Sequence, residues 1–148
     1  MTQEECYMAQ ALALAEEAGQ AGDIPVGCVV VKDGQVIGSG RNQREASGDA
    51  TAHAEVEAIR AACARLGSWH LEGCDLYVTL EPCPMCAGAI INARIQRVWY
   101  GARNPKAGCC GSVIALFQER FNHRPQVYGG VLEPSCGQVL ECFFQSLS

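Results

Sequence analysis

The spacing of hydrophobic and polar residues along the chain predicts alternating helices and strands. Apolar residues recur every three or four positions in some segments and form short runs bounded by glycine, proline or aspartate in others. These patterns predict, in order, a helix over 2–19, strands over 26–31 and 36–38, a loop over 41–50, a helix over 51–66, a strand over 76–80, a helix over 85–93, a strand over 98–100, a short helix over 113–120, a strand over 127–131 and a helix containing 136–147. This order favours an α/β layered sheet with parallel crossovers.

Length and composition are those of one globular domain spanning residues 1–148. The chain has 148 residues, of which 49% are hydrophobic and 18% are charged. It contains no internal repeat, linker, charged heptad or glycine period, which excludes coiled-coil, collagen-like and disordered chains.

We expect a cytoplasmic protein. The start of the chain is acidic and lacks the basic and apolar regions of a signal peptide. No apolar stretch approaches the roughly 18 residues of a membrane span. The ten cysteines are then expected to be reduced, and clusters of them suggest metal binding or catalysis.

Two segments combine residues suited to a metal site. His53 and Glu55 stand at the start of one predicted helix, and Cys83 and Cys86 stand at the start of another. Alone, the cysteine pair could be a redox pair or half of a structural zinc site, and the histidine could be a helix cap. Together, one imidazole and two thiolates leave a fourth zinc position for water, and Glu55 supplies the base that a hydrolytic site needs.

The same segments resemble the signature of zinc-dependent deaminases. The resemblance to bacterial tRNA-specific adenosine deaminases extends over nearly the whole chain, through the segments Ile24-Pro25-Val26-Gly27, Arg41-Asn42, Asp49 to Glu55, Thr79 to Ala89, Tyr100 to Arg103 and Phe121 to Arg124. It implies a three-layer α/β/α sandwich around a mixed five-stranded sheet.

The resemblance also implies a function and a site. His53, Cys83 and Cys86 would bind one Zn²⁺ per subunit, and Glu55 would shuttle protons while water attacks C6 of adenine at the wobble position of a tRNA anticodon stem-loop, giving inosine. Asn42, the backbone amide of Ala54 and the loop containing Asn104 would contact the substrate. Many relatives have aspartate where this chain has Asn104, and many end in a basic helix that this chain lacks. A homodimer is also implied.

Two other functions are compatible with the motif. A deaminase of free bases or nucleotides, of the guanine or cytosine type, could use the same zinc signature. A zinc-stabilised binding module could use the ligands without catalysis, but it would have no need of Glu55.

The charge is unevenly distributed between the two parts of the chain. The net charge is −5, with 5 basic and 13 acidic residues in 1–90 and 6 basic and 3 acidic residues in 91–148. The acidic total argues mildly against nucleic acid, whereas the basic segment adjoins the loop expected to meet RNA.

The cysteines outside the motif are predicted to be small core residues or tolerated loop residues. The prediction of a core position covers Cys6, Cys28, Cys63, Cys136 and Cys142.

Overall fold

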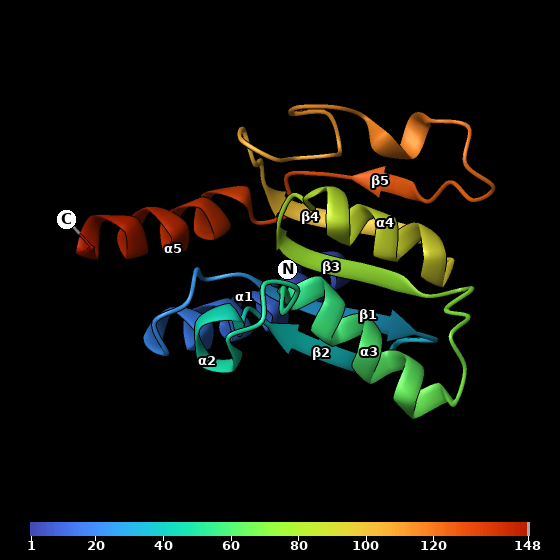
Figure 1. The fold of residues 1–148 in the computed structure, drawn as a ribbon, viewed down its shortest axis with the longest axis horizontal. Coiled ribbons are helices and arrows are strands. Elements are labelled where there is room, and N and C mark those ends of the chain that lie inside the picture. Colours follow the sequence, from blue (N-terminus) through green and yellow to red (C-terminus); the bar gives the residue numbers. More distant parts are fainter. Residues whose placement is uncertain (148) are drawn as a thin grey trace.

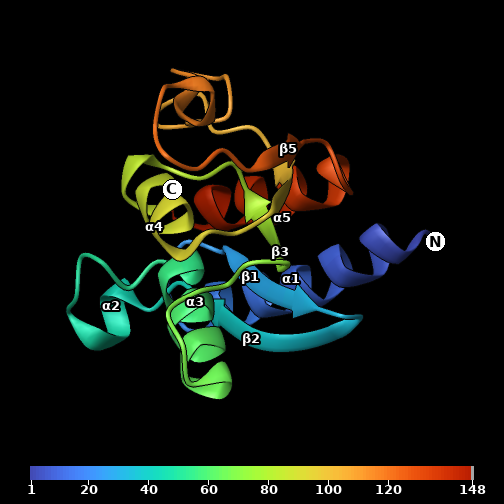
Figure 2. The same cartoon turned by 90° about the vertical axis from the view of Figure 1, so that its right-hand side faces the viewer.

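The computed structural model describes residues 1–147, so the end of the expected domain at Ser148 lies outside the described residues. In the described part, the strands form a five-stranded sheet with helices on both faces (Figures 1 and 2). The elements are α1 (Gln3–Gln20), β1 (Gly27–Lys32), β2 (Gln35–Arg41), α2 (Arg44–Ser47), α3 (Ala54–Leu66), β3 (Asp75–Leu80), α4 (Pro84–Ala93), β4 (Arg97–Ala102), the 3-10 turn η1 (Leu116–Gln118), β5 (Gln126–Tyr128) and α5 (Glu133–Ser146).

The sheet is mixed. Its strand order is β2-β1-β3-β4-β5, in which β1 is antiparallel to both neighbours and β3, β4 and β5 run parallel. Figure 2 shows α3 and α4 on one face of the sheet and α1 and α5 on the other. The predicted three-layer α/β/α sandwich is therefore confirmed. None of the helices within residues 1–147 combines the length and hydrophobicity needed to cross a membrane.

Side chains that alternate along the strands build a separate core on each face. On β1, Cys28 and Val30 belong to the core beneath α3 and α4, whereas Val29 and Val31 belong to the core beneath α1. The period of two follows from strand geometry. Both faces of β1 are buried, which explains why the sequence shows a continuous apolar run there.

Small residues bring α3 unusually close to the edge strand β2. Gly38 and Gly40 share one face of β2, and a Cβ atom added at Gly40 would lie 2.6 Å from the carbonyl oxygen of Ala54. The facing residues on α3 are Ala54, Ala58 and Ala62, which recur every four residues and are buried. This contact fixes the height of the first turn of α3 above the sheet.

Some element boundaries differ from the predictions because side chains elsewhere in the fold cap or bind the backbone. The predicted loop over 41–50 contains α2, where the carboxylate of Asp23 accepts a hydrogen bond from Glu45 N at 2.9 Å. The helix predicted from residue 51 begins at Ala54, because Asp49 holds Thr51 N in a turn at 2.8 Å. The predicted helix over 113–120 is only η1, since Leu116 N donates to Cys109 O instead of to a helical partner.

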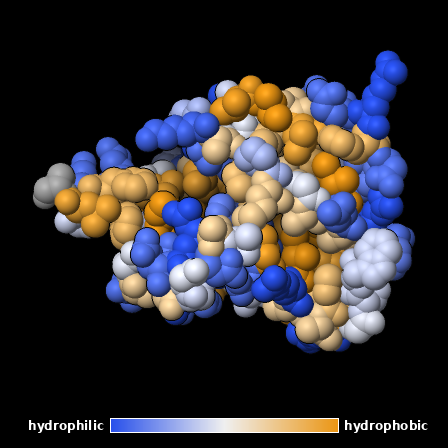
Figure 3. All heavy atoms as spheres, viewed as in Figure 1, coloured by the Kyte–Doolittle hydropathy of each residue, from blue (hydrophilic) through white to orange (hydrophobic). Residues whose placement is uncertain are grey.

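The prediction of core positions was wrong for Cys6 and Cys142, which are exposed. Cys6 lies on the side of α1 opposite the buried stripe that includes Met8. Cys142 lies in the second half of α5, which projects beyond the sheet in Figure 1. Figure 3 shows hydrophobic side chains along this projecting helix, and the exposed Phe144 belongs to the same part of it. An apolar pattern therefore did not ensure burial where the sheet ends.

Candidate metal centre and active site

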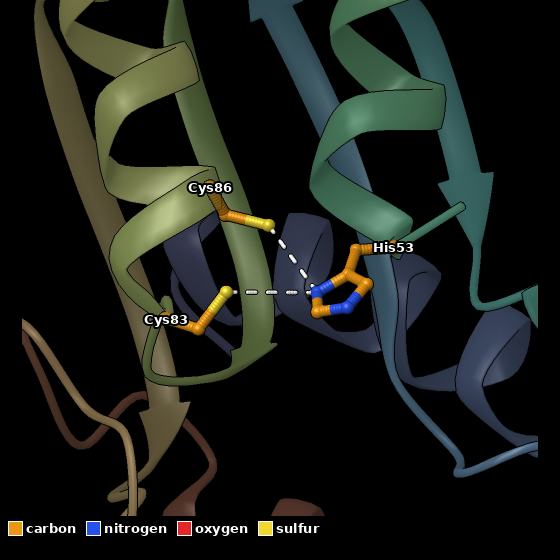
Figure 4. Close-up of side chains that lie close together, drawn as sticks. All are labelled: His53, Cys83 and Cys86. Atoms are coloured by element: carbon orange, nitrogen blue, oxygen red, sulfur yellow. Dashed lines mark hydrogen bonds between the residues drawn. The ribbon is translucent and has the colours of Figure 1, made fainter. Parts of the chain in front are cut away.

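The candidate site lies where α3 and α4 begin side by side at one end of the sheet. His53 is the N-cap of α3, with an extended backbone, and Cys83 is the N-cap of α4. Pro84 occupies the first turn of α4, where its missing N–H group is tolerated. Cys86 follows in the same turn, so the Cys-Pro-Met-Cys segment directs both sulfur atoms toward His53 (Figure 4).

The three side chains have the spacing of zinc ligands. Nδ1 of His53 lies 3.6 Å from Sγ of Cys83 and 3.5 Å from Sγ of Cys86. Tetrahedral zinc at its usual bond lengths would separate a nitrogen and a sulfur ligand by about 3.6 Å. Among residues 1–147, this is the only group of three or more histidine, cysteine or acidic side chains placed to hold a metal ion. The donor set and its geometry therefore fit zinc with three protein ligands.

Helix ends and mutual contact prepare the thiols for metal binding. A hydrogen bond from Cys86 lowers the pKa of Cys83 to about 4, and the same contact raises the pKa of Cys86. The positive end of the α4 dipole also favours negative sulfur in this turn. Cys83 can therefore bind zinc as a thiolate, and binding of zinc must displace the proton of Cys86.

Glu55 is a buried carboxyl group beside the ligand set. It lies in the first turn of α3, is 4% exposed, and lines the same cavity as His53 and Cys83. Burial raises the pKa of Glu55 to about 7. A carboxyl group in this position can exchange protons near neutral pH, as a general acid and base must.

The structure brings all the predicted site residues to one place. A cavity of about 180 Å³ is lined by Asn42, His53, Glu55, Cys83 and Asn104 among others. Ala54 is adjacent to Glu55, and Cys86 completes the metal set. A larger cavity of about 410 Å³ is lined by the first residues of β3 and β4, at the strand ends opposite the ones that lead to the metal-binding residues. The smaller cavity is the one that combines the metal ligands with a proton donor.

Asn42 orients the start of α3. Its Oδ1 accepts a hydrogen bond from Ala54 N at 2.9 Å, and its Nδ2 donates to Ile24 O at 3.0 Å. The side chain is 7% exposed and faces the cavity. The substrate contacts expected of Asn42 and Ala54 remain predictions, and a contact to the Ala54 amide would compete with Asn42.

Sequence reasoning assigned no role to Glu81, which organises the loop on the other side of the cavity. Its carboxylate is 1% exposed and accepts hydrogen bonds from the backbone N–H groups of Asn104 at 3.1 Å, Cys110 at 2.8 Å and Ser112 at 3.1 Å, and from the Ser112 hydroxyl. Burial opposes ionisation, but these bonds outweigh it and hold the pKa of Glu81 below its ordinary value. An acidic residue directly after a buried strand was the available signal.

The fold and this site define a zinc-dependent deaminase domain. The family described as the cytidine and deoxycytidylate deaminase zinc-binding region matches residues 1–102. The chain therefore belongs to the cytidine and deoxycytidylate deaminase family.

Individual relatives show which members of this family the chain resembles. The chain is 49% identical over 148 residues to the tRNA-specific adenosine deaminase of Bacillus subtilis (strain 168), covering 99% of this chain and 92% of the relative. A solved structure from a study of A-to-I editing by tRNA:A34 deaminases at the wobble position superposes with a TM-score of 0.87 at 47% identity, covering 90% of this chain and 98% of that one. Guanine deaminase from Bacillus subtilis superposes with a TM-score of 0.66 at 42% identity, covering 84% and 82%. The resemblance to tRNA-specific adenosine deaminases is confirmed.

Proposed function

We propose that this chain is a zinc-dependent hydrolase that converts adenosine to inosine at the wobble position of a tRNA anticodon. The observation that carries the proposal is the buried carboxyl group of Glu55 in the cavity formed by His53, Cys83 and Asn42. The relatives supply the substrate class, because the Bacillus subtilis protein is a tRNA-specific adenosine deaminase. The deaminase domain is proposed to extend over residues 1–148.

The chain's own groups divide the reaction between them. His53, Cys83 and Cys86 would hold one zinc ion, which when bound supplies the Lewis acidity that makes water a nucleophile near neutral pH. Glu55 accepts a proton from the attacking water and returns protons to the ring nitrogen and to the departing amine. Water adds at C6, the C6–N bond breaks, and ammonia leaves, so that inosine is the product.

The basic residues near the cavity support an RNA substrate. Among the basic residues of 91–148, Arg97 forms an ion pair with Asp75 at 3.0 Å. This pair lies at the start of β4, at the end of the strand away from the metal-binding residues. Arg103 and Lys106 are exposed on the loop that contributes Asn104 to the cavity. Positive charge at the entrance attracts a polyanion even when the whole chain is acidic.

The decisive assay incubates zinc-loaded protein with an anticodon stem-loop carrying adenosine at the wobble position, and with guanine, cytosine and cytidine in parallel. We expect inosine from the RNA alone. Glu55→Gln keeps the shape of the side chain, so it should retain zinc and its melting temperature but lose at least about 100-fold in rate. Deamination of free bases without RNA turnover would favour the alternative function. Full activity of zinc-loaded Glu55→Gln would contradict the mechanism.

We also propose a cytoplasmic homodimer. Large apolar side chains at Met85, Val113 and Ile114 are exposed, by 36%, 55% and 48% respectively. Val113 and Ile114 are adjacent in the chain, and contiguous exposed apolar side chains often mark a subunit interface. Light scattering coupled to size-exclusion chromatography should give twice the mass of 15.8 kDa, and cell fractionation should recover the protein with the cytoplasmic contents.

A further inference from the structure

Arg44 has a polar atom that the chain itself does not satisfy. It is the first residue of α2, is half-buried, and lines the cavity together with His53 and Glu55. Its Nε atom is buried and has no hydrogen-bond partner among residues 1–147. Buried polar atoms are nearly always paired, so an unpaired guanidinium nitrogen beside a cavity calls for a partner from outside.

No ion pair joins Arg44 to Asp23 in the described part of the chain. The Asp23 carboxylate instead accepts hydrogen bonds from the backbone N–H groups of Ile24 at 3.0 Å and Glu45 at 2.9 Å. In the described part of the chain, the ion pairs involve Arg41, His70 and Arg97 and leave Arg44 without a counter-charge.

Arg44 faces the same cavity as the metal-binding set. His53 and Cys83 line that cavity together with it, so the guanidinium group lies at the site and not on a remote surface.

The backbone around Arg44 is fixed, which limits the entropy lost when its side chain binds a ligand. Glu45 N is held by Asp23, Gly48 N donates to Arg44 O at 2.9 Å, and Gln43 N donates to Ala52 O at 2.9 Å. Figure 1 places α2 and the loop after β4 at the same end of the sheet, where α3 and α4 begin. Asn104 and Ala107 of that loop line the cavity together with Arg44.

We propose that Arg44 binds the phosphodiester group adjacent to the nucleoside that enters the cavity, so that it selects a nucleotide within an RNA strand over a free base or nucleoside. This inference rests on the proposed function. A strand that places one base in the cavity must leave its flanking phosphates at the entrance. A guanidinium fork matches two phosphate oxygens, and a side chain that turns toward the strand can offer them both Nε and an Nη group.

The test combines a change in the protein with a change in the RNA. Arg44→Gln removes the charge, Arg44→Lys keeps the charge without the fork, and Arg60→Gln is the matched control, because Arg60 is an exposed arginine on α3 that does not line the cavity. The RNA is the wobble-adenosine stem-loop, either unmodified or with one neutral methylphosphonate linkage on the 5′ or the 3′ side of the target. Zinc content and melting temperature are measured for every variant.

We expect Arg44→Gln to lower kcat/KM on the unmodified RNA by roughly 10-fold to 100-fold, mainly through KM. Arg44→Lys should recover part of this loss, and Arg60→Gln should match the wild type. For Arg44→Gln, the slope of log KM against log salt should fall by about 0.7, the value for one lost contact to single-stranded RNA. A methylphosphonate at one of the two linkages should weaken the wild type by the same factor and leave Arg44→Gln unchanged.

Three results would overturn this inference. The first is an Arg44→Gln protein with wild-type kcat/KM on the RNA. The second is a methylphosphonate effect of equal size in the wild type and in Arg44→Gln at both linkages. The third is a wild-type protein that leaves the RNA adenosine unchanged, which would overturn the proposed function as well and so differs from the first two.

Discussion

Gly40→Ala is expected to displace the first turn of α3 from the sheet. The added Cβ atom would lie 2.6 Å from Ala54 O, Ala58 N and Glu57 Cβ. Favourable contact between such atoms begins near 3.5 Å. Because two of the three neighbours are backbone atoms of the helix, α3 must move outward by about 1 Å. The same turn carries the metal ligand His53 and the carboxyl group of Glu55.

The effect on activity should exceed the effect on stability. Overpacking of this kind costs about 1–3 kcal/mol of unfolding free energy. For a domain of this size, each kcal/mol lowers the melting temperature by about 2–4 °C, so a fall of roughly 2–12 °C is expected. A displacement of about 1 Å in a catalytic geometry can lower the rate about 100-fold, even in protein that remains folded.

Two other glycines provide matched controls. A Cβ at Gly38 would lie 2.5 Å from Ala58 O and 2.6 Å from Ala62 N, one turn farther from the site. Gly38→Ala should therefore lose similar stability and much less activity. A Cβ at Gly88 in α4 would have no heavy atom within 4 Å, so Gly88→Ala should be neutral or stabilising by up to about 1 kcal/mol.

The measurements are thermal melts followed by circular dichroism, zinc content by atomic absorption, and single-turnover deamination of the stem-loop RNA well below the melting temperature. The reasoning is refuted if Gly40→Ala keeps the wild-type rate while melting lower. It is equally refuted if Gly38→Ala loses as much activity as Gly40→Ala.

Three further predictions concern the metal, the loop and the thiols. Removal of zinc with a chelator should abolish activity. If free zinc stands at about 1,000 times its Kd beforehand, the removal should also lower the free energy of unfolding by about 4 kcal/mol. Re-added zinc should restore both in the wild type but not in Cys83→Ser. Ser112→Ala removes one of the four hydrogen bonds to Glu81 and should raise KM for RNA several-fold with little change in kcat. Ser112→Thr keeps a hydroxyl group and should behave as the wild type. Equal behaviour of the two variants would exclude a role for the hydroxyl. Brief maleimide treatment of zinc-loaded protein should label the exposed Cys6 and Cys142, whereas Cys28, which is buried, should react only after unfolding; mass spectrometry of peptides distinguishes these outcomes.

The metal ligands could be predicted because residues close together in the sequence already show the spacing of a metal site. Cys83 and Cys86 share one helical turn, and His53 precedes Glu55 at another helix start, so each half of the site is visible in a few residues. The order of strands and helices predicted an α/β layered sheet with parallel crossovers. The two halves were joined by their combined donor set and by the resemblance to zinc-dependent deaminases, and the fold then shows both helix starts at one end of the sheet (Figure 1).

The remaining features depend on contacts between segments far apart in the sequence. Asp23 stabilises α2 from 22 residues away, and Glu81 collects N–H groups from a loop 23 to 31 residues later. No periodicity encodes such pairings. The loop has its shape because several N–H groups converge on one buried carboxylate, a result that depends on the tertiary fold.

The charges at the site explain why an acidic chain needs separate cations at the cavity entrance. Two thiolates, together with Glu55 when it is ionised, bring up to three negative charges together, and a zinc ion would offset two of them. The remaining negative charge, inside a poorly solvated cavity, would repel the phosphates of an approaching strand. Arg44 lines the cavity, and Arg103 and Lys106 are exposed on the loop that contributes its opposite wall. These cations counter the negative charge of the site and favour the approach of a polyanion. The net charge of −5 is a sum over the whole chain, so the local arrangement of charges at the cavity matters more for RNA binding than the total.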